Sequence, residues 1–153
     1  TGKQQFAFDF VHDDGETIYA TRGGVVGDVV ESNSMTFSPC ADNNTGIKGD
    51  EEDKKADGPA NFVRVDHQDG TYSYYAHVQK NSVVPNKGDV VARGAAIAKV
   101  GNVGRSCGPH LHYQVAIDST NTIYGQTKQI CFETSTSSCY VPKTDDVLVS
   151  TNA

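Results

Sequence analysis

Residues 61–78 read Asn61-Phe62-Val63-Arg64-Val65-Asp66-His67-Gln68-Asp69-Gly70-Thr71-Tyr72-Ser73-Tyr74-Tyr75-Ala76-His77-Val78. Both halves of this stretch are rich in β-branched and aromatic residues, which favour strands. An Asp-Gly dipeptide between two such runs is typical of a tight β-hairpin. The stretch therefore predicts two antiparallel strands, residues 61–67 and 71–78, joined by a short turn.

Short strand patterns extend outward from this hairpin in both directions. They cover residues 6–10, 17–20, 24–30, 89–92, 96–100 and 110–115, and glycines separate several of them. No segment carries a helical period. Residues 32–59 lack periodicity and contain a run of charges, which is typical of a long exposed insertion. The sequence thus predicts an all-β fold, with a twisted antiparallel sheet forming a groove.

Length and charge restrict the classes of protein to consider. The chain has 153 residues, with 13 Lys and Arg, 19 Asp and Glu, and a net charge of −6. We expect one domain over residues 1–153, with a core at about 6–118, the insertion at about 32–59 and a C-terminal hairpin extension at about 119–153. An acidic chain without a basic cluster is not expected to bind nucleic acid. No run of about 18 apolar residues occurs, so no membrane span is expected.

Four cysteines, at positions 40, 107, 131 and 139, indicate the cellular compartment. None forms a Cys-x-x-Cys pair. Two disulfides in an oxidising compartment are favoured over four buried free thiols in a cytosolic protein. Cys131 and Cys139 flank seven residues that resemble a hairpin closed by its own bridge. The chain begins at Thr1 rather than Met, and a mature secreted protein would have lost its signal peptide. We therefore expect a secreted, extracellular or periplasmic protein.

The histidines are the candidates for chemistry. His110 and His112 are two residues apart on a predicted strand, so both rings project from the same face. A metal ion is one partner for such a pair, because neutral imidazole binds Zn²⁺ well, whereas exposed histidines on an edge strand would give the same pattern. His12 and His67 lie beside turns and are expected to be solvated. Aromatic residues near these positions are expected to form strands or line a groove: Tyr72, Tyr74, Tyr75 and Tyr113.

Several motifs together point to a known family. Residues 101–113 end in Gly108-Pro109-His110-Leu111-His112-Tyr113, residues 69–77 end in Tyr75-Ala76-His77, residues 87–94 are a glycine-bracketed strand, and Phe8-Asp9-Phe10 opens the first strand. In this order, over roughly residues 6–118, the set resembles the LytM/lysostaphin-type zinc endopeptidases. The cysteine layout is similar to that of the staphylolysin (LasA-type) branch. That similarity implies the pairs Cys40–Cys107 and Cys131–Cys139.

The resemblance implies a role for each of four residues. Asp9 and His112 would be zinc ligands. His77 and His110 would lie beside the water that the metal activates and would act as general base and as stabiliser of the tetrahedral oxyanion. Zinc lowers the pKa of its water towards ~7, and neutral imidazoles can take or return a proton near that pH.

The family's first zinc ligand is absent from its usual position. A catalytic zinc takes three protein ligands and keeps one open position, and the family's first ligand is a His that commonly stands four residues before the Asp. Gln5 occupies that position, and its uncharged amide binds zinc weakly. Two interpretations stay open. Either the domain has lost metal binding and kept the shape, or a His directly precedes Thr1 and supplies the third ligand.

The function that the resemblance implies is a secreted zinc metalloendopeptidase with one zinc per chain. It would hydrolyse peptide bonds in peptidoglycan or in Gly-rich peptides by metal-activated water. The alternative is a degenerate, non-catalytic LytM-like module that binds wall peptide or a protein partner. A third possibility is an extracellular structural subunit, because a fold alone does not determine function. The sequence does not indicate the oligomeric state.

Overall fold

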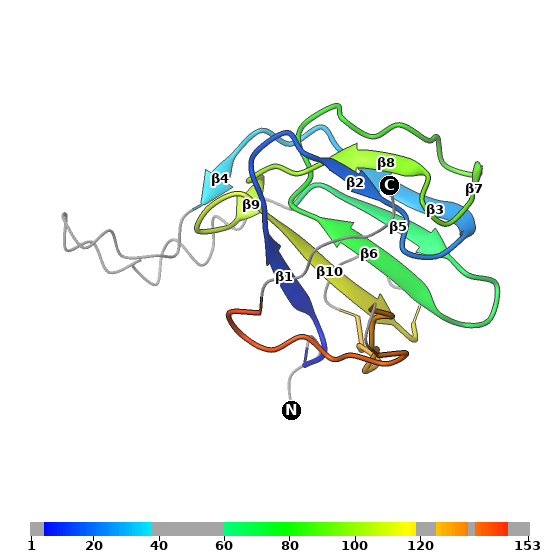
Figure 1. The fold of residues 1–153 in the computed structure, drawn as a ribbon. Helices are drawn as coiled ribbons and strands as arrows, with labels where there is room; N and C mark the ends of the chain where they lie inside the picture. The colour runs from blue at the N-terminus through cyan, green and yellow to red at the C-terminus, as the bar shows by residue number, and fades with distance from the viewer. Residues whose placement is uncertain (1–4, 38–59, 119–124, 135–136, 147–153) are drawn as a thin grey trace.

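The computed structural model describes residues 5–37, 60–118, 125–134 and 137–146 of the chain. These residues form strands and loops and contain no helix, which confirms the all-β prediction. The strands follow one another in this order (Figure 1): β1 (Phe8–Val11), β2 (Thr17–Tyr19), β3 (Gly24–Val30), β4 (Thr36–Phe37), β5 (Phe62–Asp66), β6 (Tyr72–Ala76), β7 (Val90–Val91), β8 (Ala96–Lys99), β9 (Gly104–Arg105) and β10 (His110–Ala116).

A six-stranded sheet with the order β1-β10-β6-β5-β3-β7 is the centre of the fold (Figure 1). Its neighbouring strands are all antiparallel. The predicted hairpin forms the middle of this sheet, with Phe62 opposite Ala76 in β5 and β6. β1 forms one edge and pairs with β10. Asp9 therefore lies opposite His112, 103 residues further along the chain.

One face of the six-stranded sheet carries the main hydrophobic core. Val63, Val65 and Tyr75 belong to this core and are fully buried. The two-stranded sheet of β2 and β8 contributes Ile18 and Ile97 to the same cluster. Burying side chains of this size contributes roughly 1.5–3 kcal/mol each. The core therefore holds the strands whose opposite face carries the predicted site residues.

One strand of a small parallel pair lies in the stretch where the sequence predicted only an aperiodic insertion. β4 pairs with β9 through Thr36 opposite Gly104 and Phe37 opposite Arg105. Two-residue strands leave no periodic pattern to detect, which explains why the sequence did not reveal this pair. The rest of the predicted insertion, residues 38–59, lies outside the described residues. The division of residues 1–153 into one core, an insertion and an extension stays a prediction.

The C-terminal part of the described chain contains the predicted disulfide-closed hairpin. Cys131 and Cys139 are bonded, with their Cα atoms 5.0 Å apart. Beside the disulfide, Phe132 and Tyr140 pair as an antiparallel bridge. This confirms the Cys131–Cys139 prediction. Cys40 lies outside the described residues, so the predicted Cys40–Cys107 pair stays a prediction.

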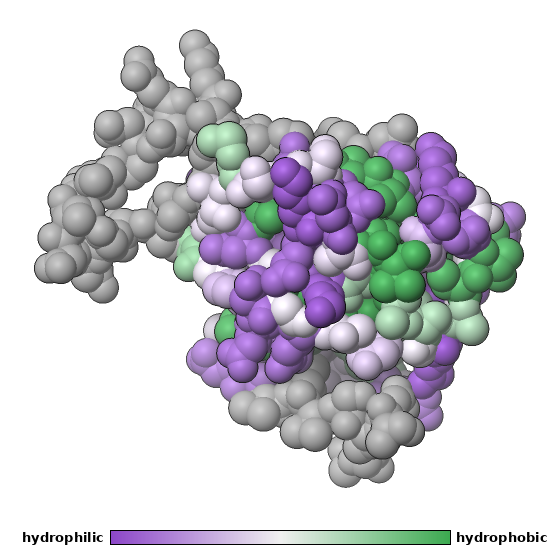
Figure 2. Space-filling model, turned by 90° about the horizontal axis from the view of Figure 1, so that it is seen from above, coloured by the Kyte–Doolittle hydropathy of each residue, from purple (hydrophilic) through white to green (hydrophobic). Residues whose placement is uncertain are grey.

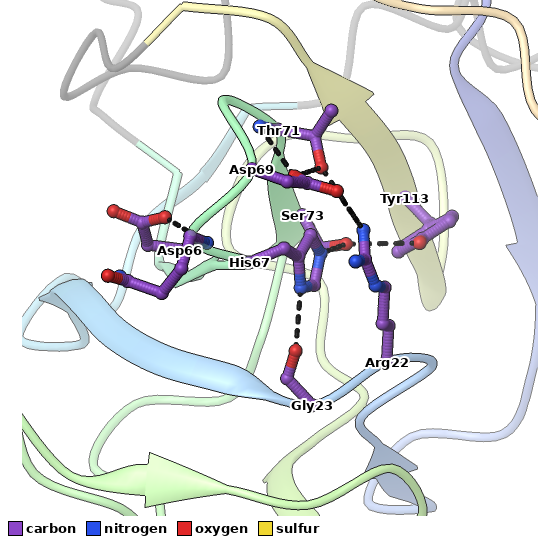
Figure 3. A network of polar contacts seen from close by, with 9 residues as sticks. Arg22, Gly23, Asp66, His67, Asp69, Thr71, Ser73 and Tyr113 are labelled. Carbon is purple, nitrogen blue, oxygen red and sulfur yellow. Dashed lines mark hydrogen bonds and ion pairs between the residues drawn. The ribbon is translucent and has the colours of Figure 1, made fainter.

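The expectation that His67 is solvated was wrong. This residue is only 8% exposed. Its Nδ1 lies 2.9 Å from the carbonyl oxygen of Gly23, and its Nε2 lies 2.7 Å from the hydroxyl of Ser73 (Figure 3). The chain entering β3 passes beside the β5–β6 turn and covers the ring. The Gly23 carbonyl and the Ser73 hydroxyl therefore take the place of the solvent water expected around this ring.

The turn between β5 and β6 is also tied to the chain before β3. A guanidinium nitrogen of Arg22 lies 2.8 Å from a carboxylate oxygen of Asp69 (Figure 3). The other carboxylate oxygen of Asp69 accepts hydrogen bonds from the backbone and hydroxyl of Thr71. The hydrogen bonds from Thr71 and Arg22 hold the pKa of Asp69 well below its usual range. This turn lies at the end of the hairpin away from His77.

The surface is mixed in character. The face seen from above is mostly polar, with apolar groups gathered towards one side (Figure 2). Some large apolar side chains are exposed, among them Val11, Val84 and Val90. None of the described residues belongs to a helix with the length and apolarity needed to cross a bilayer.

Candidate active site

The four side chains expected to form the site lie together near the β1 edge of the six-stranded sheet. Asp9 and His112 are direct partners in the antiparallel register, so their side chains point to the same face. His110 lies two residues earlier on β10 and shares that face. His77 directly follows β6, which is the other neighbour of β10. Its ring centroid lies 4.6 Å from that of His110 and 6.0 Å from that of His112.

Alternation along β1 explains why Asp9 faces the histidines. Phe8 and Phe10, on either side of it, pack against the main core on the opposite face. Their rings are stacked with centroids 6.1 Å apart. This is the arrangement that the Phe-Asp-Phe pattern predicts. The apolar neighbours anchor the strand and leave the carboxylate 63% exposed on the other side.

Asp9 and His112 form a close ion pair. Oδ1 of Asp9 lies 2.8 Å from Nδ1 of His112 and 3.8 Å from Nε2 of His110. The hydrogen bond from His112 lowers the pKa of Asp9. Burial opposes a charge on His112, but its hydrogen bonds to Asp9 and Gln114 outweigh this effect and raise the pKa of His112. Both shifts favour a carboxylate facing an imidazolium.

Gln114 orients the His112 ring through the ring nitrogen that does not contact Asp9. Nε2–H of His112 donates to Oε1 of Gln114 at 3.0 Å. The Gln114 side chain is fully buried, and its Nε2 has no hydrogen-bond partner among the described residues. Because Gln114 holds one ring nitrogen, the other, Nδ1, is directed at Asp9. A partner of this kind fixes the tautomer and the orientation of a histidine.

His77 is held as a neutral imidazole. Its Nδ1–H donates to the carbonyl oxygen of Val103 at 2.7 Å. Burial lowers the pKa of His77 to about 4, which the hydrogen bond to Val103 offsets only in part. The lone pair on Nε2 therefore stays available at neutral pH. The backbone of His77 has a φ of 63°, a left-handed conformation that is uncommon outside glycine and often occurs at functional positions.

His110 is oriented by the loop that precedes β10. Its Nδ1–H donates to the carbonyl oxygen of Gly108 at 2.8 Å. The hydroxyl of Ser106 lies 3.1 Å from the same nitrogen and donates to the same carbonyl at 2.8 Å. Ser106 is itself buried, with 3% exposed. The remaining ring nitrogen, Nε2, is the one near Asp9.

Each of the three rings thus commits one nitrogen to a protein oxygen and keeps the other for the site. The groups that face the site are Nε2 of His77, Nε2 of His110, and the paired Nδ1 of His112 and carboxylate of Asp9. Imidazole nitrogens and a carboxylate oxygen are the ligands that zinc takes in hydrolytic sites, and the spare imidazoles are suited to proton transfer. The donor chemistry of Asp9 and His112 therefore fits zinc.

The described residues do not complete a three-ligand set. Within the ranges that the structure describes, no group of three or more His, Cys, Asp or Glu is arranged to hold a metal ion. Gln5, at the family's usual His position, lies in a turn and is exposed. His12 makes an exposed contact with Glu16, 2.7 Å from Nδ1 to the carboxylate. A third ligand is thus not identified.

The groups that orient the three rings were missed at the sequence level. Gln114 could have been found, because it continues the alternation of His110 and His112 on one face of the strand. The carbonyls of Val103 and Gly108 carry no side-chain signal and could not have been found. They depend on how the segment between β8 and β10, which contains β9, folds.

The tyrosines near these strands belong to the interior. Tyr74, Tyr75 and Tyr113 are almost completely buried. The hydroxyl of Tyr113 lies 2.8 Å from that of Thr21 and 3.2 Å from that of Ser73. Packing and internal hydrogen bonds explain these three residues.

Comparison with known proteins gives a consistent family assignment. A family model described as Peptidase family M23 matches residues 3–124. The peptidoglycan DD-endopeptidase ShyA of Vibrio cholerae is 39% identical over 57 residues, which are 37% of this chain and 13% of that protein. The chain thus aligns with only a small part of the curated relatives that it matches.

Two solved structures have a similar fold. A zinc containing peptidase from Vibrio cholerae is 26% identical, with a TM-score of 0.50, and the match covers 70% of this chain and 25% of that one. The catalytic domain of the antimicrobial peptidase lysostaphin from Staphylococcus simulans is 21% identical, with a TM-score of 0.57. That match covers 82% of this chain and 74% of that one. At such low identity, the lysostaphin match shows the fold alone.

Proposed function

Because the chain belongs to peptidase family M23, we propose that it is a zinc metalloendopeptidase that hydrolyses peptide bonds in peptidoglycan or in Gly-rich peptides. The observation that carries this proposal is the pairing of Asp9 with His112, 2.8 Å apart, beside the rings of His77 and His110. A peptidoglycan substrate is supported by the similarity to the peptidoglycan DD-endopeptidase of Vibrio cholerae. The zinc is supported by the donor chemistry and by the similarity to a zinc containing peptidase from the same organism.

Asp9 and His112 are the residues that would hold the metal. Zinc, when bound, supplies a water of lowered pKa and polarises the scissile carbonyl. His112 would bind through Nδ1, because its Nε2–H is committed to Gln114. Ligands of this kind must lose their protons first, so metal binding would release the Nδ1 proton of His112.

His110 is the residue to which we assign proton acceptance. Its Nδ1–H is committed to Gly108, which leaves the Nε2 lone pair for the attacking water. Once Nε2 carries a proton, it lies 3.8 Å from a carboxylate oxygen of Asp9, close enough for an ion pair. The protonated ring can then return the proton to the leaving amine.

His77 is assigned to the oxyanion. Its ring lies beside that of His110, and hydrogen bonding to Val103 fixes its orientation. A preoriented polar group at the position of a developing charge stabilises the transition state without reorganisation. The contact requires a proton on Nε2, which His77 lacks at neutral pH because burial holds its pKa at about 4. His77 would therefore accept the proton that His110 has taken from the water, since the two rings lie side by side, and would return it through His110 for the leaving amine.

A second candidate function is a non-catalytic binding module of the same family. The observation that favours it is Gln5, which is exposed at the position of the family's first His. The described residues also contain no complete metal-holding cluster. In this alternative the domain would bind wall peptide or a protein partner on its surface and would not hydrolyse it.

The compartment follows from the same proposal. The Cys131–Cys139 disulfide supports an oxidising environment. We therefore infer a secreted, extracellular or periplasmic location, where peptidoglycan is also found.

Metal analysis and two variants test the function. The native protein should contain about one zinc per chain, and His110→Ala should abolish hydrolysis of cross-linked peptidoglycan peptides while zinc stays bound. His112→Ala should release the zinc. A metal-free native protein without hydrolytic activity would favour the binding module. If both variants hydrolyse at the wild-type rate, the assignment of roles is wrong.

A further inference from the structure

The disulfide-closed hairpin lies beyond residue 124, where the family match ends. It is held by the Cys131–Cys139 bond and by two backbone hydrogen bonds between Phe132 and Tyr140, of 2.7 and 2.8 Å. In Figure 1 the orange-to-red C-terminal segment passes the lower ends of β1 and β10. The base of the hairpin therefore lies next to the two strands that carry Asp9 and His112.

Phe132 packs against the reverse side of both strands. Its ring lies edge-on to Phe8 and Phe10, with centroid distances of 5.5 and 5.7 Å. It also lies 6.1 Å from the ring of Tyr113. Phe8 and Phe10 flank Asp9, and Tyr113 directly follows His112. Strand residues alternate between faces. The Phe132 ring therefore contacts β1 and β10 on the face opposite the one that carries Asp9 and His112.

β1 has few other attachments. It is four residues long and forms the edge of the sheet, so β10 is its single partner strand among the residues that the structure describes. The segment just before Phe132 adds a second link, since the hydroxyl of Thr127 accepts a hydrogen bond from the backbone of Phe6 at 3.1 Å. Thr127 also bridges to Ala116 at the end of β10. The C-terminal segment thus connects the chain just before β1 with the end of β10.

We propose that the Cys131–Cys139 hairpin is a positioning element, which uses Phe132 to hold Asp9 at the correct distance from His112. The inference rests on the proposed function, in which these two side chains hold the metal. Phe132 touches no reacting atom and acts only through the strands. A short edge strand without this support would separate from β10 more often, and the carboxylate would leave the site.

Backbone hydrogen exchange and zinc affinity of the full chain test this proposal. In Phe132→Ala, the amides of residues 8–11 should exchange at least about tenfold faster, whereas those of β5 and β6 stay close to wild type. Zinc affinity, measured by competition with a chelator, should fall on the order of tenfold. Phe132→Leu should restore part of both properties. The double variant Cys131→Ser/Cys139→Ser opens the loop without changing the ring and should resemble Phe132→Ala.

Controls separate this effect from general loss of stability. Ile97→Ala removes a buried side chain from β8, which pairs with β2 and not with β1. It should lower overall stability without selective exchange in β1. If Phe132→Ala does not fold, the same measurements on Phe132→Leu and on the double serine variant test the proposal. Wild-type exchange in β1, or faster exchange with unchanged zinc affinity, would overturn the proposal. If the wild-type protein takes up no zinc, the proposed function fails. The rate of amide exchange in β1 then tests by itself whether the hairpin supports this strand.

Discussion

Gln114 determines which nitrogen of His112 faces the site. Its Oε1 accepts a hydrogen bond from Nε2–H of His112 at 3.0 Å, and its side chain is completely buried, so no water can take its place. Gln114→Met keeps the approximate volume of the side chain but removes the acceptor. Zinc affinity should then fall about 10–100-fold, as is typical when the partner of a metal-bound histidine is lost. Competition titration with a chelator measures this change.

Gln114→Glu is the matched control, because it keeps an acceptor oxygen at the same position. It should bind zinc at least as well as wild type, since a carboxylate makes the imidazole a stronger ligand. Nitrogen NMR of the metal-free proteins should show His112 protonated at Nε2 in both wild type and Gln114→Glu. Wild-type affinity in Gln114→Met would contradict this role.

His77 should make the stability of the metal-free protein depend on pH. Its folded pKa is about 4, below the unfolded value of about 6.5. Between these values the unfolded chain binds the proton and the folded one does not, so the free energy of unfolding falls as the pH drops from about 6.5 to about 4. The loss from this residue should be about 2–3 kcal/mol. Above pH 6.5 both states are neutral and the effect disappears.

Urea unfolding of wild type and His77→Gln, in the presence of a chelator, isolates this contribution. The difference in stability between the two proteins should change by about 2–3 kcal/mol between pH 7 and pH 4. Contributions from Asp9 and His112 are common to both proteins and largely cancel. A constant difference over this range would mean that His77 is not buried as a neutral ring.

The sequence identified single residues where strand alternation alone determines orientation. Asp9 and His112 face each other because both lie on regular, paired strands, and the family motifs name them. His67 was misjudged because its environment depends on Gly23, a residue 44 positions away. Nothing in the local pattern around a turn reveals that a distant carbonyl will cover it.

At the level of elements, the β4–β9 pair connects the start of the predicted insertion with the site. Gly104, the first residue of β9, donates its backbone N–H to the carbonyl of Met35 at 2.8 Å. It directly follows Val103, whose carbonyl orients His77. Gly104 has a φ of 93°, and a Cβ there would lie 2.8 Å from the Cα of Ala60. A larger residue at this position therefore strains the backbone and requires Ala60 to shift.

Gly104→Ala should accordingly impair both stability and turnover. The unfavourable backbone conformation and the contact with Ala60 should cost at least about 1–2 kcal/mol in unfolding experiments. Movement of the Val103 carbonyl should lower kcat at unchanged zinc content. Gly94→Ala is the control, because its φ is 82° but no atom lies within 4 Å of the new Cβ. It should cost about 1 kcal/mol and leave kcat unchanged; equal kcat in both variants would refute the coupling.

Element by element, the long strands were predictable and the short ones were not. The hairpin of β5 and β6 has strong strand formers on both sides of Asp-Gly, and its register follows from the turn. β4 and β9 exist because two distant segments meet, and their four residues carry no pattern of their own. The Cys131–Cys139 loop was visible from its spacing, but its contact with β1 was not.

For the whole molecule, metal binding should appear as thermal stability. A ligand that binds only the folded state adds RT ln(1 + [L]/Kd), or about 2.7 kcal/mol at a hundredfold excess over Kd. For a chain of this length, Tm should then rise by about 5–10 °C when zinc is added to chelator-treated protein. Differential scanning calorimetry measures the shift. Asp9→Ala and His112→Ala should show no rise in Tm when zinc is added. A wild-type Tm that does not change with zinc would contradict the proposed metal site.

The two halves of the ion pair are 103 residues apart in the chain, and they meet only when the first described strand joins the last. Closing so large a loop is entropically slow, and the contact gains nothing until the intervening strands have formed. A nascent or truncated polypeptide that ends before β10 would consequently lack the site at which we propose that hydrolysis occurs. Synthesis order alone would keep the polypeptide inert until almost the whole sheet has been made.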